Sequence, residues 1–190
     1  MPNAANFLND ICRNAVNRRL LERLADLELN DTWLVAGCLF QTVWNLRSAR
    51  PPASGIRDYD IFYFDDSDLS WDAENEHIGR VQRDFRDLGA QVELKNQARV
   101  HLWYGERFGP GYPQLRNSRD GIDRFLSACT RVGVRANAPN DLELYAPDGL
   151  DDLYNGILRP NPLNDRPDLV LAKAESYKER WPWLEIRPAK

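Results

Sequence analysis

The alternation of apolar and polar residues predicts a chain that passes between helices and short strands. Apolar residues recur at helical spacing through residues 6–28, with Arg and Asn between them, which predicts an amphipathic first helix. Residues 33–36 form a short apolar run that predicts a buried strand. Gly37 interrupts this run, and residues 38–44 are expected to form a second helix. Two prolines and a glycine within residues 50–55 then predict a loop.

This loop leads into the most informative segment of the sequence. Asp58 and Asp60 open an otherwise apolar strand, and side chains two residues apart share one face of a strand, roughly 7 Å apart at about 3.3 Å of rise per residue. Residues 61–64 are apolar or aromatic on both faces, which is typical of a strand covered on both sides. Charges that run into a buried face are costly unless they are paired or coordinate a metal. The pair therefore predicts a site for one or two divalent cations, the simpler alternative being two solvated aspartates at a strand end.

The rest of the chain completes the predicted order of elements. Ser70 is expected to cap a helix that has an acidic first turn and ends at Gly89. The remaining elements are a hairpin of strands at 92–94 and 99–104, a loop over 105–117, a helix over 120–132, a strand at 142–145, a turn or short helix at 150–154, and a last helix over 168–181, in which Lys173 and Tyr177 lie one turn apart.

Composition and charge narrow the class of protein. The 190 residues fit one domain, 1–190, with a core over about 28–105 and a C-terminal extension over about 106–190. The net charge is −4, so nucleic-acid binding is possible but is not indicated by charge. Three widely spaced cysteines match no disulfide framework or zinc site, and no apolar run approaches the roughly 20 residues of a membrane span. We therefore expect a cytoplasmic protein without a membrane partner.

The order of elements and several short motifs resemble the nucleotidyltransferase fold of the DNA polymerase β superfamily, and more closely a bacterial family of uncharacterised predicted nucleotidyltransferases. The motifs are residues 34–38 with Gln41, residues 58–64, residues 96–104, and residues 146–152 followed by 159–161. The resemblance spans most of the chain. It implies an α+β fold in which a polymerase β palm-like mixed sheet is flanked by helices and followed by a C-terminal helical extension.

The resemblance also implies residues that bind a nucleotide. Gly37 and Cys38 occupy the position where the superfamily points a helix N-terminus at the nucleotide phosphates, and Gln41 follows one turn later. Most members carry Gly-Ser or Gly-Gly there, so the thiol of Cys38, a weak hydrogen-bond donor, is a departure from the pattern. Arg57, Lys95 and Arg99 flank the acidic edge as further candidates for phosphate contacts, the alternative being ordinary strand-end charges.

In the superfamily the paired aspartates hold two cations, so the resemblance implies that Asp58 and Asp60 bind Mg²⁺ or Mn²⁺. A third carboxylate normally lies on the neighbouring strand. The predicted hairpin puts His101 near that position, as a general base, a metal ligand or an ordinary sheet histidine. Glu93, on the partner strand of the hairpin, is the other catalytic candidate at the same edge.

These residues lead to three functional hypotheses. The first is a metal-dependent nucleotidyltransferase that moves a nucleoside monophosphate from a nucleoside triphosphate to an unknown hydroxyl acceptor and releases pyrophosphate. The second is a catalytically degenerate binding or regulatory module of the same fold, because His101 stands where an acid is expected. The third is a nucleotide-sugar glycosyltransferase, since an Asp-x-Asp strand end also binds Mn²⁺ in that class.

Overall fold

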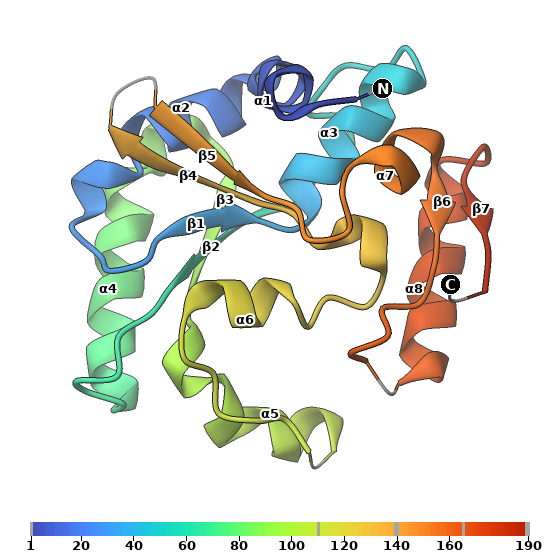
Figure 1. Cartoon of the computed structure of the whole chain (residues 1–190). Coiled ribbons are helices and arrows are strands. Elements are labelled where there is room, and N and C mark those ends of the chain that lie inside the picture. The colour runs from blue at the N-terminus through green and yellow to red at the C-terminus, as the bar shows by residue number, and fades with distance from the viewer. Residues whose placement is uncertain (1, 110, 139–140, 165, 189–190) are drawn as a thin grey trace.

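A five-stranded mixed sheet forms the centre of the computed structural model, which describes residues 2–109, 111–138, 141–164 and 166–188 (Figure 1). The spatial order of its strands is β3-β2-β1-β4-β5. β2 is antiparallel to β1 and parallel to β3, while β4 and β5 form an antiparallel hairpin beside β1. The strands are β1 Trp33–Val35, β2 Asp58–Tyr63, β3 Gln91–Asn96, β4 Gly133–Ala138 and β5 Asp141–Tyr145. The predicted α+β class with a mixed sheet is therefore confirmed, and two of the strands come from residues beyond 105.

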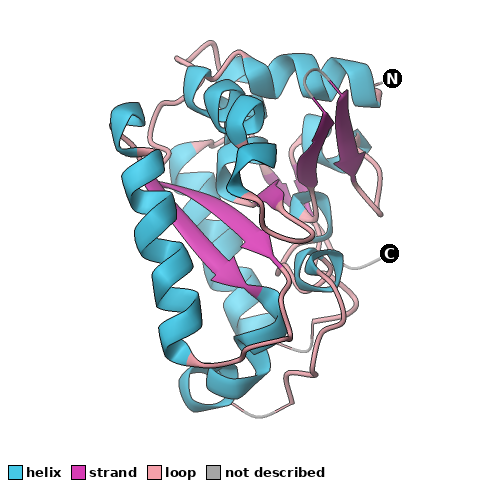
Figure 2. Cartoon of the chain, turned by 90° about the vertical axis from the view of Figure 1, so that its left-hand side faces the viewer, coloured by secondary structure: helices cyan, strands magenta, loops and turns pink. Residues whose placement is uncertain are grey.

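Helices surround this sheet (Figure 2). They are α1 Ala4–Cys12, α2 Ala15–Arg23, α3 Gly37–Arg47, α4 Trp71–Asp84, α5 Val100–Phe108, α6 Ser118–Ile122, α7 Asp151–Asn155 and α8 Pro167–Arg180. Single 3₁₀ turns lie at Ala25–Leu27, Arg86–Leu88, Gln97–Arg99 and Ala128–Thr130. Two short parallel strands, β6 Ile157–Leu158 and β7 Glu185–Ile186, flank α8 in the sequence. The strands predicted near 33, 58 and 142 and the helices predicted near 38, 71, 150 and 168 are confirmed.

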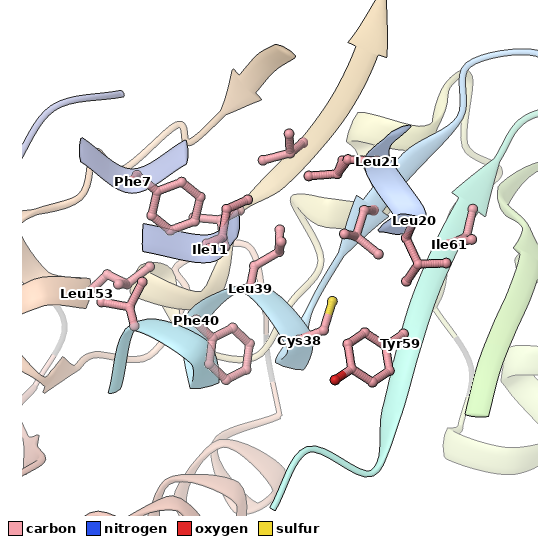
Figure 3. Packing of buried hydrophobic residues seen from close by; sticks show 14 of the residues in the cluster. Phe7, Ile11, Leu20, Leu21, Cys38, Leu39, Phe40, Tyr59, Ile61 and Leu153 are labelled. Atoms are coloured by element: carbon pink, nitrogen blue, oxygen red, sulfur yellow. The ribbon is translucent and has the colours of Figure 1, made fainter. Parts of the chain in front are cut away.

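The main hydrophobic core lies between the sheet and the N-terminal helices. Alternate residues of β2, among them Tyr59 and Ile61, turn toward this core and are buried. They pack with Leu20 of α2 and Leu39 of α3 (Figure 3). Because side chains alternate along a strand, the other residues of β2 face away from this core. The acidic pair is among those outward residues.

The single helix predicted over residues 6–28 is wrong, because the chain breaks at Asn14. This residue has extended backbone angles and its side chain accepts a hydrogen bond from the backbone N–H of Val16, which caps α2. Its amide nitrogen donates to the hydroxyls of Thr42 at 3.1 Å and Tyr59 at 3.3 Å. The helical spacing on both sides of Asn14 was correct, but the buried amide ends one helix and begins the next.

The hairpin predicted over 92–104 is also wrong. β3 pairs with β2, and the residues expected to form the second strand instead form a 3₁₀ turn and α5. Asn96 ends the strand: its side chain accepts hydrogen bonds from the backbone N–H of Ala98 and of Asp65, both at 3.1 Å. Its amide nitrogen donates to the carbonyl of Asp65 at 2.8 Å. α5 continues to Phe108, so the predicted loop starts later than expected.

A third correction concerns the helix predicted over 120–132, since α6 ends at Ile122. The amide nitrogen of Asn161 donates to the carbonyls of Asp123 at 2.8 Å and Phe125 at 2.6 Å, and its backbone N–H donates to Leu126 at 2.9 Å. These three carbonyls are bound from a distant segment and are not available to a continuing helix. The chain therefore runs irregularly here and then enters β4, a strand that the sequence pattern did not predict.

Candidate active site

Asp58 and Asp60 lie on the face of β2 that is turned away from the main core. Both carboxylates line a cavity of about 340 Å³. In the register of the sheet, Asp60 is the partner of Val35 on β1 and of Glu93 on β3. The strand alternation predicted for the acidic pair is therefore found, and the two aspartates share one space.

The N-terminus of α3 opens on the same cavity, which Ala36 and Gly37 line. Ala36 has φ 62° and ψ −140°, a conformation that costs a non-glycine residue about 1–3 kcal/mol and is typical of functional turns. Within the described residues, no side chain caps this helix. The backbone N–H groups at its start can therefore donate hydrogen bonds to an anionic ligand, with the helix dipole adding to the attraction.

Gln41 lies directly over the start of α3. A Cβ atom added to Gly37 would clash with the amide nitrogen of Gln41, so the glycine makes room for this side chain. The amide oxygen of Gln41 accepts a hydrogen bond from the guanidinium of Arg180 at 3.0 Å. Gly37 and Gln41, both predicted from the sequence, thus lie together at the helix N-terminus and both line the cavity.

α8 contributes Leu169, Lys173 and Tyr177 to the lining of the cavity that holds the acidic pair. The ammonium of Lys173 and the guanidinium of Arg180 each lie 5.4 Å from the centre of the Tyr177 ring. Lys173 is the cation that α8 contributes to the cavity lining.

An aromatic cluster fixes α8 against α3. The ring of Tyr177 meets those of Phe40 at 5.5 Å and Trp44 at 5.3 Å, both edge-on. Trp44 also packs on Trp181 at 5.3 Å, and the indole N–H of Trp181 donates to Asn45 at 3.0 Å. This docking holds the C-terminal helix at the cavity that the acidic pair also lines.

The remaining wall comes from Tyr104 of α5, from residues 124–127, and from Thr130 and Asn164. The hydroxyl oxygen of Ser127 is buried, and no described residue bonds to it. Residues 124–127 were not predicted as part of a site, because their spacing imitates a helix. No local signal in the sequence shows that Asn161 holds them in an irregular path.

The neighbouring strand brings a third carboxylate to the acidic pair. Glu93 is the Cα partner of Asp60, so the two side chains lie on the same face of the sheet. The ammonium of Lys95 lies between them, 2.9 Å from Oδ1 of Asp60 and 3.1 Å from Oε2 of Glu93. The other oxygen of Glu93 accepts a hydrogen bond from Gln91 at 2.8 Å.

Burial and these contacts shift the pKa values of Asp60, Glu93 and Lys95. Burial raises the pKa of Asp60, and the adjacent charge of Lys95 opposes that rise. Burial acts in the same direction on Glu93, but the hydrogen bond and charge of Lys95 outweigh it and leave the pKa of Glu93 below its usual value. Burial lowers the pKa of the Lys95 ammonium, but the charges and hydrogen bonds of Asp60 and Glu93 outweigh burial and hold that pKa above its usual range. The cluster is a carboxylate pair held together by one internal cation.

His101 does not take the position expected for the third residue. It lies in the first turn of α5, because the predicted second strand of the hairpin is a helix. It is not among the residues that line the cavity, and its Nδ1 is buried with no hydrogen-bond partner in the described part of the chain. Glu93, which the sequence left as the alternative, is the Cα partner of Asp60, although it is not among the residues that line the cavity either.

The thiol of Cys38 also points away from the cavity. It donates to the carbonyl of Val35 at 3.2 Å and is enclosed in the main core (Figure 3). Burial raises the pKa of this thiol well above its usual value. Its side chain is therefore not a phosphate donor, and only the backbone N–H of Cys38 is left for that role.

Arg57 and Arg99, which were expected to contact phosphates, do not line the cavity. Arg99 is buried and forms an ion pair with Glu74, while its Nε donates to the carbonyl of Leu69 at 2.9 Å. It thus ties the start of α4 to the end of β3 and is a structural residue. Arg57 is exposed at the entry to β2 and does not line the cavity.

The donor set suits a hard divalent cation. Asp58, Asp60 and Glu93 supply carboxylate oxygens, the ligands that Mg²⁺ and Mn²⁺ prefer, and the ammonium of Lys95 shows that the space between two of them accommodates a positive charge. Among the described residues, no group of three His, Cys, Asp or Glu side chains is arranged to hold a metal ion as it stands. The three residues fit the metal by chemistry, and two of them, Asp60 and Glu93, are bound to Lys95 in this arrangement.

Comparison with known proteins agrees with this geometry. A family model described as nucleotidyltransferase matches residues 22–186. A solved structure described as a protein whose NMR structure reveals a CCA-adding enzyme head domain is 30% identical, with a TM-score of 0.79, and the match covers 98% of this chain and 97% of that chain. No protein of curated function matches the sequence.

Two further solved structures share the fold at low identity. One is described as a tRNA-processing enzyme in an apo form, with 13% identity and a TM-score of 0.53, covering 98% of this chain and 45% of that chain. The other is described as a complex of a tRNA-processing enzyme and has 14% identity and a TM-score of 0.50. The match covers 88% of this chain and 43% of that chain. No helix in the described ranges has the length and apolar character needed to cross a membrane.

Proposed function

The chain belongs to the nucleotidyltransferase family, and we propose that it moves a nucleoside monophosphate from a nucleoside triphosphate to a hydroxyl acceptor. The observation that carries this proposal is a shared cavity: Gly37 at the N-terminus of α3 and the carboxylates of Asp58 and Asp60 line the same space. A triphosphate with its cation needs both an anion-binding backbone and acidic metal ligands. Both requirements are met within about 340 Å³.

The phosphates would lie against the start of α3. The uncapped N–H groups after Ala36 offer donors to phosphate oxygens, and Gln41 adds a side-chain amide at the same point. Lys173 supplies a positive charge from α8. In this arrangement the triphosphate lies between α3 and α8.

The acidic strand would carry the chemistry. Asp58 and Asp60 would hold Mg²⁺ or Mn²⁺, which when bound neutralises phosphate charge and activates the attacking hydroxyl. The hydroxyl oxygen forms a bond to the α-phosphorus while the bond from that phosphorus to the bridging oxygen breaks, and pyrophosphate leaves with the electron pair. Glu93 lies beside Asp60 and would accept the hydroxyl proton.

A tRNA 3′ hydroxyl is the acceptor to test first. The 30%-identical structure is described as a CCA-adding enzyme head domain, and the two remote ones as tRNA-processing enzymes. The net charge of −4 gives no wide electrostatic attraction for RNA, so small hydroxyl compounds belong in the same assay.

Nucleotide binding and turnover are tested separately. At about 100 times Kd, a non-hydrolysable nucleoside triphosphate with Mg²⁺ should raise the melting temperature by about 5–10 °C. Asp58→Asn and Asp60→Asn should remove this shift, whereas Asp66→Asn, at an exposed aspartate after β2, should keep it. Absence of a shift with each of the four common nucleoside triphosphates would contradict the proposal.

The contact of Lys95 with Asp60 and Glu93 favours a second candidate, a binding module of this fold without turnover. It predicts the same melting shift but no pyrophosphate release with any acceptor. Measurable pyrophosphate release that Asp60→Asn abolishes would exclude it. The family assignment leaves no support for a nucleotide-sugar glycosyltransferase.

A further inference from the structure

We propose that Lys95 is a built-in competitor for the cation site, whose ammonium a divalent cation must displace before it can bind between Asp60 and Glu93. The inference rests on the proposed function, because it concerns the carboxylates of the same site.

The register of two strands creates this competition. Asp60 and Glu93 are Cα partners on parallel strands, and Phe62 and Lys95 are the next partners on the same face. Lys95 therefore starts two residues beyond Glu93 and its side chain turns back toward it. Its ammonium reaches one oxygen of each acid, at 2.9 Å and 3.1 Å.

The contact satisfies the acids in the absence of a metal ion. One oxygen of Glu93 bonds to Lys95 and the other to the amide of Gln91. The side chain of Asp60 is only 15% exposed, and without Lys95 it would lie beside Glu93 as an uncompensated like charge. The ammonium of Lys95 thus offsets part of the negative charge of these acids, and it occupies Oδ1 of Asp60 and Oε2 of Glu93, two of the oxygens that a metal would need.

Lysine is suited to leave when a stronger cation arrives. Its ammonium is a single charge on a flexible four-carbon stem, and here the side chain is 41% exposed, so a route to solvent is open. A half-exposed ion pair of this kind is individually weak. The need to displace Lys95 should therefore lower the affinity of the site for a divalent cation moderately, without abolishing binding.

Direct binding of Mn²⁺ tests the inference without any reaction. Free Mn²⁺ is measured by electron paramagnetic resonance during titration of the natural protein, Lys95→Met and Lys178→Met. Lys178 is exposed on α8, so its removal changes the net charge equally but leaves the acids untouched. We expect Lys95→Met to bind Mn²⁺ about tenfold more tightly and Lys178→Met to match the natural protein. Equal or weaker binding by Lys95→Met overturns the inference.

A second measurement uses the unmodified chain, in case Lys95→Met does not fold. The sequence has four lysines, so their side-chain ammonium signals can be resolved by nuclear magnetic resonance. Saturating Mg²⁺ should move the Lys95 signal and leave that of Lys178 in place. A Lys95 signal unchanged at saturation overturns the inference.

The failure of the inference can be told apart from failure of the proposed function. If nucleotide with Mg²⁺ raises the melting temperature through Asp58 and Asp60 while Lys95→Met leaves Mn²⁺ affinity unchanged, only the role of Lys95 is wrong. If no variant binds Mn²⁺ and no nucleotide shifts the melting temperature, both are wrong.

Discussion

Asp60 and Glu93 are Cα partners across the parallel pair of β2 and β3, and this pairing places a third carboxylate beside the acidic strand. The connection between them runs through α4, so the two strands form a β-α-β unit. Because of this pairing, we expect removal of the Glu93 carboxylate, and not of His101, to slow transfer much more than it weakens nucleotide binding.

Glu93→Gln should lower the rate of transfer far more than it lowers nucleotide binding. If Glu93 accepts the hydroxyl proton, the loss in kcat should be about 10²–10⁴-fold. The melting shift with nucleotide should be smaller but still measurable, because Asp58 and Asp60 remain while one of the two acids beside Lys95 is lost. Glu76→Gln, at an exposed position on α4, serves as the matched control and should keep the natural rate. Equal rates for Glu93→Gln and the natural protein would show that another group takes the proton.

Gly37→Ala should weaken nucleotide binding without unfolding the protein. The new Cβ would clash with the amide nitrogen of Gln41 and push that side chain away from Arg180. Calorimetric titration with a non-hydrolysable triphosphate should show the loss.

The control for this substitution is Gly79→Ala on α4. A Cβ there meets only Arg83 at an ordinary 3.4 Å, so the variant should be more stable by about 0.5–1 kcal/mol and bind nucleotide normally. Unchanged affinity in Gly37→Ala would mean that phosphates do not approach the start of α3.

Glu74→Ala should destabilise the fold strongly. It leaves the guanidinium of Arg99 buried without its partner and removes the acceptor of the backbone N–H of Asn96, which now bonds to Glu74 at 2.8 Å. Removing one partner of a buried pair costs about 3–5 kcal/mol. Urea unfolding should show this, while Glu22→Ala, from an exposed pair on α2, should change stability by less than about 1 kcal/mol. A small effect at Glu74 would contradict the structural role of Arg99.

Tyr145→Phe should make the fold less sensitive to alkaline pH. Burial, followed by hydrogen bonds to Asp123 at 2.9 and 3.0 Å, raises the pKa of Tyr145 to about 12. A raised pKa in the folded state adds stability below the unfolded pKa of about 10, and this contribution is lost as pH rises toward the folded value. The stability advantage of the natural protein over Tyr145→Phe should thus be constant below about pH 9 and shrink from pH 10 to 12. A difference that does not change across this range would refute the assignment.

The elements predicted correctly are those whose signal is local. The apolar run at residues 33–36, the glycine that follows it, and the acidic strand from Asp58 each carry their own pattern of alternation and breakers. The errors arose where a distant residue decided the outcome. Residues 99–104 suit a strand or a helix by spacing alone, and the cap formed by Asn96, together with pairing of β3 to β2, selects the helix.

The candidate site likewise has one part that local sequence predicts and another that distant residues decide. By itself the sequence determined that Asp58 and Asp60 share one face of a strand and that Gly37 begins a helix, because both follow from backbone geometry over a few residues. Only the tertiary structure decided that Glu93 lies beside Asp60 with Lys95 between them, and that α8 lines the same cavity as Asp58 and Asp60. Those relations depend on strand register and on helix docking between segments far apart in the chain. Free energy gained by burying the whole core selects that register, and no short stretch of sequence contains this information.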